Sequence, residues 1–183
     1  MSKSPIVFQD PPLAQFLFGS TKTAWVWLIV RLYVGWAWLE AGWAKLHAAA
    51  WVGPDAGSAL AGFVHGALAK TSGAHPDVQG WYAWFLSHGV LSYASVWSHF
   101  VAWGELAVGI GLMLGVLTGI AAFFGAFMNL NYLLAGTVSV NPVLGVLGLG
   151  IMMAWKVAGY IGADRWLLPF LGTPWRPGSL FKR

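Results

Sequence analysis

The sequence predicts an all-α membrane protein: an antiparallel four-transmembrane-helix bundle with a long extracytoplasmic connection between helices 1 and 2. Composition is the first reason, because 58% of the 183 residues are hydrophobic and only 9% are charged, against roughly 25% charged in an average soluble domain. The mean hydropathy is also high, at +0.66. The third reason is four apolar stretches near the length of about 20 residues that a helix needs to cross a bilayer. Together these features argue against a disordered chain and a soluble enzyme.

The expected membrane spans follow one another at 23–46, 96–117, 120–138 and 143–162, within a single domain of residues 1–183. Each span should be helical, because a segment in hydrocarbon must satisfy its own backbone hydrogen bonds. Asn141 and Pro142 mark the turn before the last span, since proline suits a first helical turn. The first stretch is not read as a signal peptide, because it is too long and contains Arg31 and Glu40.

The connection at 48–95 is expected to form a cap over one end of the bundle. Glycine and proline break it at 53–54 and 72–76, and the apolar stretch 58–69 between these breaks predicts a short helix. The stretch 77–86 looks like a second interfacial piece, with aromatic anchors. A connection of this length without structure of its own is uncommon in a compact domain.

Basic residues are concentrated in the two tails and are sparse in the long connection. Those in the tails are Lys3, Lys22, Arg165, Arg176, Lys182 and Arg183, against Lys70 in the connection. The positive-inside rule therefore predicts a multi-pass protein of a prokaryotic cell membrane, with both termini cytoplasmic and the cap outside. The net charge of +4 is assigned to this orientation, so the expected partner is the lipid bilayer and not nucleic acid.

The chain contains no cysteine, which excludes iron–sulfur clusters, thiolate zinc sites and dithiol redox chemistry. Five histidines remain, but none form an i, i+4 pair. His47 and His99 lie toward helix ends, so neither haem nor a metal site is expected. If electrons pass through the protein, they come from a partner, which would be another membrane or extracytoplasmic redox subunit.

Ionisable side chains inside the spans need a reason, since each costs on the order of 3 kcal/mol near the bilayer centre. Their depths in an up-and-down bundle predict two clusters. The outer cluster comprises Glu40, Lys45, Glu105 and Asn129 or Asn131, with His47 and His99 at its rim. The inner cluster comprises Arg31 and Lys156, with Asp164 near the cytoplasmic end.

Two interpretations of the outer cluster stay open. In the first, Lys45 neutralises a glutamate and the asparagines bond between helices, so the cluster only holds the bundle together. In the second, a buried carboxylate exchanges protons with a quinone, because desolvation raises the pKa of a buried glutamate toward neutrality. Trp103 lies deep enough to flank a planar ligand or to fill the core.

Three stretches resemble the DoxX family of small four-helix membrane proteins. They are RLYVGWAWLEAGWAKL (31–46), WGELAVGIGLMLGVLTGIAAFFGAFMNLNYLLAG (103–136) and NPVLGVLGLGIMMAWKVAGYIGADRWLLP (141–169). The resemblance implies a left-handed antiparallel bundle. It also implies a role like that of the DoxD subunit of thiosulfate:quinone oxidoreductase, which works with a separate DoxA subunit to oxidise thiosulfate to tetrathionate and reduce a quinone.

The resulting hypothesis is a quinone-interacting membrane subunit of an oxidoreductase, active as a thiosulfate dehydrogenase only with a partner chain. Glu40 or Glu105 would exchange the proton and Lys45 would tune the carboxylate. The quinone would be bound by Arg31, Lys45, Asn129, Asn131, Trp103 and Lys156. The alternative is a non-catalytic accessory subunit of a larger respiratory or photosynthetic complex. A transporter is the weakest option, because the four spans show no clear inverted repeat.

Overall fold

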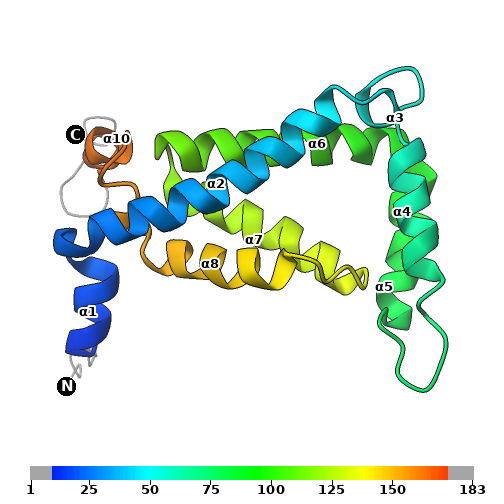
Figure 1. The fold of residues 1–183 in the computed structure, drawn as a ribbon, viewed down its shortest axis with the longest axis horizontal. Coiled ribbons are helices and arrows are strands. Elements are labelled where there is room, and N and C mark those ends of the chain that lie inside the picture. The colour runs from blue at the N-terminus through cyan, green and yellow to red at the C-terminus, as the bar shows by residue number, and fades with distance from the viewer. Residues whose placement is uncertain (1–9, 173–183) are drawn as a thin grey trace, which may run out of the picture.

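The computed structural model describes residues 10–172, and every regular element among them is a helix (Figure 1). Four long helices make up the bundle: α2 (Ala24–Leu46), α6 (Ala94–Leu114), α7 (Thr118–Leu134) and α8 (Asn141–Met153). The sequence predicted helices in these four places. The last differs most, because the helix expected over 143–162 ends at Met153 and is followed by the separate short helix α9 (Trp155–Ala158).

Helices α2 and α6 pack closely because glycines let their backbones approach. A Cβ atom added at Gly109 would lie 2.5 Å from the Cα of Leu39, and one added at Gly42 would collide with the backbone of Leu106. Small residues at helix contacts in a membrane allow this kind of approach. The core that all four helices enclose includes Val34, Trp38, Val108, Leu112, Ala122, Leu144 and Ile151.

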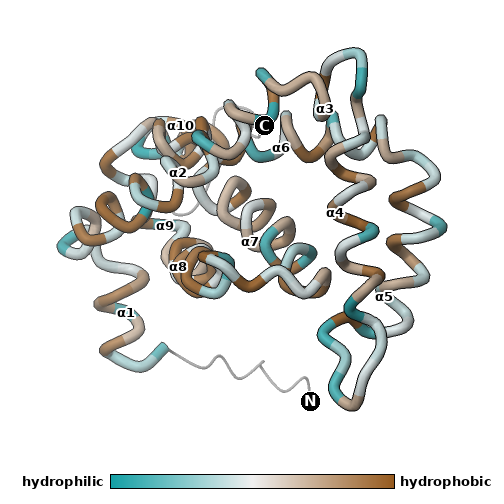
Figure 2. The backbone as a smooth tube through the Cα atoms, turned by 45° about the vertical axis from the view of Figure 1, so that its right-hand side comes forward, coloured by the Kyte–Doolittle hydropathy of each residue, from teal (hydrophilic) through white to brown (hydrophobic). Residues whose placement is uncertain are grey.

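The long connection forms a helical cap, as the sequence predicted. It contains α3 (Ala49–Val52), α4 (Ser58–Leu68) and α5 (Gly80–Phe85), followed by a π-helical turn and a 3₁₀ turn that lead into α6. Helices α4 and α5 lie across one end of the bundle (Figure 1). Hydrophilic residues gather in the loop that joins α4 to α5 (Figure 2). The cap has a small core of its own, with Leu60, Val64, Tyr82, Leu86 and Val90.

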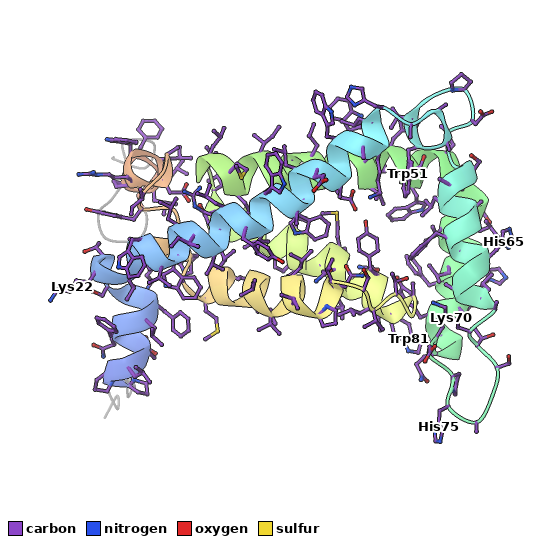
Figure 3. The ribbon with its side chains drawn as sticks, in the orientation of Figure 1. Lys22, Trp51, His65, Lys70, His75 and Trp81 are labelled. Carbon is purple, nitrogen blue, oxygen red and sulfur yellow. The ribbon has the colours of Figure 1, made fainter. Side chains whose placement is uncertain are left out.

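The opposite end of the bundle carries short helices. Helix α1 (Pro12–Gly19) precedes α2, and α10 (Asp164–Leu171) follows α9. Lys22 lies at this end, far from the cap, whereas His65 and His75 lie on the cap and point away from the bundle (Figure 3). The two ends therefore present different surroundings to the buried polar residues.

Helix length sets how many elements can cross a bilayer. Among residues 10–172, one continuous helical run is long and apolar enough, from Gly80 to Leu114. Pro12–Gly19 together with Thr21–Leu46 would be a second, although this pair is bent by 57°. Helices α7 and α8 are apolar but shorter, at 17 and 13 residues, and span about 25 Å and 20 Å at 1.5 Å per residue. The helix lengths therefore establish fewer spans than the expected four.

Candidate functional site

The most deeply buried acid of the bundle, Glu105, lies on α6 near the cap and is bonded through both carboxylate oxygens. Lys45 of α2 donates from Nζ to Oε2 over 2.6 Å. The hydroxyl of Tyr132, on α7, donates to Oε1 over 2.5 Å. Glu105 is 1% exposed, whereas the Lys45 side chain is 20% exposed. Three helices thus contribute one ionisable side chain each to a continuous hydrogen-bonded chain, called the Lys45–Glu105–Tyr132 chain below.

Lys45 also contacts the cap. Its ammonium lies 5.0 Å from the ring centroid of Trp51 in α3, a distance at which the ring face attracts a cation. The carbonyl of Trp51 in turn accepts a hydrogen bond of 2.7 Å from the hydroxyl of Ser98 on α6. The cap therefore fixes the outer end of the Lys45–Glu105–Tyr132 chain.

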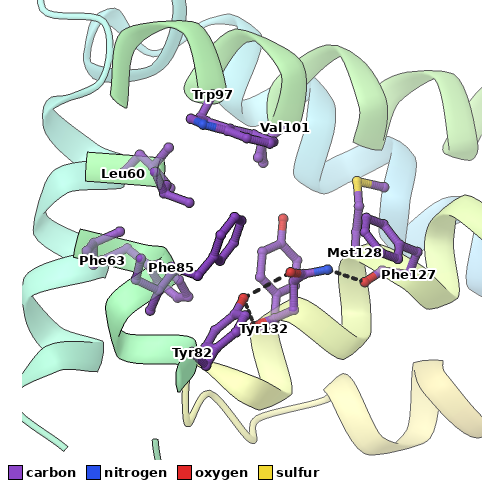
Figure 4. Close-up of a pocket in the computed structure, with 13 residues that line it drawn as sticks. Leu60, Phe63, Tyr82, Phe85, Trp97, Val101, Phe127, Met128 and Tyr132 are labelled. Atoms are coloured by element: carbon purple, nitrogen blue, oxygen red, sulfur yellow. Dashed lines mark hydrogen bonds between the residues drawn. The ribbon is translucent and has the colours of Figure 1, made fainter. Parts of the chain in front are cut away.

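A cavity of about 140 Å³ lies between the cap and the bundle, and Tyr132 is part of its wall. We call it the head cavity. Its other walls come from α4, from α5 and the turn that follows it, from the start of α6, and from α7. They are mostly apolar and aromatic, and include Leu60, Phe63, Phe85, Trp97, Val101 and Met128 (Figure 4). The cavity thus lies directly beside a phenol that is bonded to a buried carboxylate.

A second polar pair lies at the same cavity. The hydroxyl of Tyr82 in α5 is 3.0 Å from the side-chain oxygen of Asn131 and 3.0 Å from the Asn131 carbonyl. The Asn131 amide donates to the carbonyl of Phe127 over 2.8 Å. Figure 4 shows Tyr82 close to Tyr132 at one side of the cavity, and Asn131 also lines it. Asn131 was predicted as a ligand-binding residue, and the structure places it at a cavity.

Two residues predicted for this site lie elsewhere. Glu40 is exposed and has no hydrogen bond or ion pair among the described residues. Trp103 is 57% exposed on α6 and lines neither this cavity nor its neighbours. Both face outward because α2 and α6 turn their other sides toward each other, through Gly42 and Gly109. Placing Glu40 in the outer cluster on the basis of depth alone was therefore wrong.

Asn129 serves the contact between α7 and α8. Its amide donates to the carbonyl of Asn141 over 2.5 Å. Its side-chain oxygen is buried and has no partner among the described residues. Asn129 is therefore separated in role from Asn131, which faces the cap.

Arg31 lies toward the other end of the bundle, 14 residues from Lys45 on α2, or about 21 Å along the helix axis. It is buried, and its guanidinium donates to the carbonyls of Leu112 (2.5 Å), Met113 (3.2 Å) and Ile161 (2.8 Å). Gly115 has φ of +68°, and a Cβ there would lie 2.6 Å from the guanidinium. Glycine is thus needed at this helix end both for its conformation and for space.

Asp164 completes this end. Its carboxylate accepts hydrogen bonds from the backbone amides of Leu117 (2.7 Å) and Thr118 (2.8 Å) at the start of α7. Arg31 thus binds carbonyls at the end of α6 and Asp164 binds amides at the start of α7, each with the charge that the helix terminus favours. Lys156 is exposed and takes no part, lying 5.9 Å from the ring centroid of Trp155. The predicted inner cluster thus lacks Lys156.

The chain was compared with known protein families. The family model for DoxX matches residues 26–138, which is more than half of the chain. The chain belongs to the DoxX family. The match includes α2, the cap, α6 and α7, and therefore the whole Lys45–Glu105–Tyr132 chain. No curated protein and no solved structure was found to match.

Membership of the DoxX family confirms the resemblance read from the sequence and indicates a membrane protein of the DoxX type. The match ends before α8, so it leaves out Lys156 and Asp164. The residues at the cap end of this DoxX protein thus lie inside the shared region. At the opposite end, Arg31 is inside the match and its neighbour Asp164 is not.

Tyr132 was not among the residues predicted for the site, because the prediction rested on charged side chains and asparagines in the spans, and a phenol is neither. The sequence did contain a signal that could have identified Tyr132. It directly follows Asn131, on a helix whose outer part was already assigned to the outer cluster. Within residues 10–172 of this DoxX protein, no group of three or more His, Asp or Glu residues could hold a metal ion. His47 and His99 each contact a carbonyl of their own helix, at 2.8 Å and 2.7 Å.

Proposed function

We propose that this DoxX protein is a quinone-binding membrane subunit of an oxidoreductase, and that the Lys45–Glu105–Tyr132 chain exchanges protons with the quinone head in the head cavity. The observation that carries the proposal is that Tyr132 contacts both the head cavity and Glu105. Its ring is part of the cavity wall and its hydroxyl is bonded to Glu105. A ligand in the cavity would therefore lie next to a group that is connected to the bundle's most deeply buried carboxylate.

The cavity suits a quinone head in size and in chemistry. Its volume of about 140 Å³ is close to the roughly 150 Å³ of an apolar protein cavity that holds benzene. Aromatic side chains such as Phe85 and Trp97 line it, and ring-to-ring contacts favour a planar ligand. Tyr82, Asn131 and Tyr132 offer the few polar groups that fix the orientation of a ligand in an otherwise apolar site.

The Lys45–Glu105–Tyr132 chain provides a route for protons. A quinone bound there accepts two electrons and two protons when it is reduced. The Tyr132 hydroxyl, which donates to Glu105 at rest, turns toward the cavity and gives its proton to the quinone. It recovers a proton from Glu105, which takes one from the Lys45 ammonium bonded to its other oxygen. Lys45 is partly exposed and connects the route to water. Short hydrogen bonds between such groups are the geometry that proton transfer requires.

The electrons come from a partner redox subunit, because this chain has no cysteine and its own side chains carry no redox centre that the sequence identifies. With thiosulfate as donor the reaction balances: two thiosulfate ions become tetrathionate and release two electrons, which with two protons convert the quinone to the quinol. In this proposal the cap faces the outside of a prokaryotic cell membrane and the termini face the cytoplasm, as the positive-inside rule favours.

The direct test is Tyr132→Phe, assayed in the complex with its partner subunit. The ring and the cavity wall remain, but the route to Glu105 is cut, so quinone reduction should fall by about tenfold or more with assembly unchanged. Tyr93→Phe is the matched control, because Tyr93 is 64% exposed and lies outside the cavity. Equal turnover in the two variants would remove Tyr132 from the mechanism.

A non-catalytic accessory subunit is the second candidate, and one observation favours it. Both oxygens of Glu105 already have protein partners, so the Lys45–Glu105–Tyr132 chain could serve only to hold three helices together. In that case Tyr132→Phe would lower the thermal stability of the complex and leave its quinone turnover intact. The two candidates thus predict opposite changes in the same variant.

A further inference from the structure

A long apolar groove runs along the outer surface between α6 and α7. Its volume is about 980 Å³, and its walls include Ala107, Ile110, Leu114, Ile120 and Phe124. Most of these side chains are exposed, with Phe124 at 53% and Leu114 at 59%. An apolar surface of this kind needs an apolar cover.

The groove adjoins the head cavity. Trp97, Phe127 and Met128 belong to the walls of both. From Trp97 to Leu114 the groove follows 17 residues of α6, or about 25 Å at 1.5 Å per residue. A molecule whose ring lies in the head cavity would therefore have an apolar path of this length leading away from the ring.

Glycines on α6 bring it close to α7 beneath the groove. At Gly104 a Cβ atom would meet the sulfur of Met128 at 3.4 Å, and at Gly111 it would meet the Cβ of Ala121 at 3.0 Å. The absence of side chains at these positions lets the two helices meet. The groove therefore lies on the outer surface, above a closed contact between α6 and α7.

We infer that the groove between α6 and α7 holds the hydrophobic tail of the quinone whose head lies in the head cavity. This inference rests on the proposed function and specifies its ligand: a quinone with a long alkyl or polyprenyl tail, and not a small water-soluble quinone. The three wall residues that the two spaces share favour this occupant over a bilayer lipid, because one molecule then covers both.

The test compares two benzoquinones with the same head, one with a decyl tail and one with a methyl group. Binding is measured by quenching of tryptophan fluorescence, with the full chain in nanodiscs of one lipid composition. Ala107→Trp fills the groove at a position that does not line the head cavity. It should weaken the binding of the decyl quinone about tenfold, because fewer methylene groups are buried. The affinity for the methyl quinone should change by less than about twofold.

Ala44→Trp is the matched control, because Ala44 is exposed on α2 and lines neither space. It should change neither affinity. Ile110→Trp fills the groove at another position outside the head cavity and provides a second variant if Ala107→Trp folds poorly. Comparing variants with the same quinone cancels differences in how each quinone enters the bilayer.

The outcomes separate the two proposals. If both quinones bind and Ala107→Trp and Ile110→Trp leave the affinity for the decyl quinone unchanged, the tail does not lie in the groove, and the inference is overturned while the head cavity stands. If the groove variants weaken the binding of both quinones equally, the assignment of the tail to the groove fails in the same way. If neither quinone binds to the wild-type chain, the proposed function fails and the inference fails with it.

Discussion

The two ends of the bundle use buried charge in different ways. At the end that carries α10, Arg31 and Asp164 are bonded to backbone groups: three carbonyls for the arginine and two amides for the aspartate. At the cap end, Glu105 is bonded to the side chains of Lys45 and Tyr132. The second group lies against the head cavity, whereas Asp164 lines a separate apolar groove of about 560 Å³ between α7 and α10.

The difference indicates how to assign a role to a buried charge. Backbone carbonyls and amides do not exchange protons, so a charge that they surround serves to fix helix ends. Lysine, carboxylate and phenol side chains do exchange protons, so a chain of them beside a cavity is able to do chemistry. In the proposed function Arg31 therefore belongs to the architecture and Glu105 to the reaction, although both are 1% exposed.

Loss of Arg31 should give the largest effect on stability. Arg31→Met removes the guanidinium that donates to three carbonyls, those of Leu112 and Met113 at the end of α6 and that of Ile161. Each charge-assisted hydrogen bond contributes more than 1 kcal/mol. We expect a loss of roughly 3 to 4 kcal/mol and a thermal midpoint in detergent lower by about 10 °C. Lys156→Met, an exposed control, should unfold at the wild-type temperature. A stable Arg31→Met variant would show that this end of α6 is held by packing alone.

Loss of the Glu105 charge should give the largest effect on activity. Glu105→Gln keeps the size of the side chain but cannot accept and return a proton, so quinone reduction in the assembled complex should fall about 100-fold or more. Co-purification with the partner subunit shows whether assembly is intact. Turnover within a few-fold of wild type would assign Glu105 to structure and remove the distinction between the two ends.

A smaller loss of stability is expected for Asp164→Asn. Asparagine retains one acceptor for the amides of Leu117 and Thr118 but loses the negative charge at the start of α7. The cost should be about 1 kcal/mol, typical of a weakened helix cap, and quinone turnover should not change. The measurement is the thermal midpoint together with the rate. A variant that lost activity at full stability would connect this end of the bundle to the reaction.

The smallest effect is expected for Glu40→Gln. Glu40 is exposed and has no partner among the described residues, so both turnover and thermal midpoint should stay at the wild-type level within about twofold and a few degrees. Because it repeats the Glu105→Gln substitution at the other acid of the predicted outer cluster, it is the matched control for that variant. A large loss of turnover would place the proton route on the outer face of α2.

Much of the fold could be predicted, because it follows from the length of the apolar stretches and from the glycine and proline residues that interrupt them. The helix expected at 23–46 is found at Ala24–Leu46, and the connection 48–95 folds into a cap. The last helix could not be placed fully, because its end at Met153 depends on how α9 packs under α2 and α7. No local sequence signal marks that break.

The level of each site residue along the bundle could be predicted, but the direction in which its side chain points could not. Lys45 and Glu105 could be placed at the same level, and the structure pairs them. Glu40 lies at a similar level, yet it points away. Which face of α2 meets α6 is decided by glycines such as Gly42, and glycines also occur where no other element approaches, as at Gly62. Tyr132 required the packing of a third helix, which spacing in one helix does not supply.

The central claim is that the head cavity beside the Lys45–Glu105–Tyr132 chain holds a quinone. The most direct measurement is the quinone content of the purified protein after organic extraction, for wild type, Val101→Trp and Val96→Trp. Val101 lines the cavity, and Val96, on the same helix, is 54% exposed and lies outside it. The account predicts bound quinone in wild type and Val96→Trp and its loss in Val101→Trp. Wild-type protein without quinone, or equal content in all three, would contradict it.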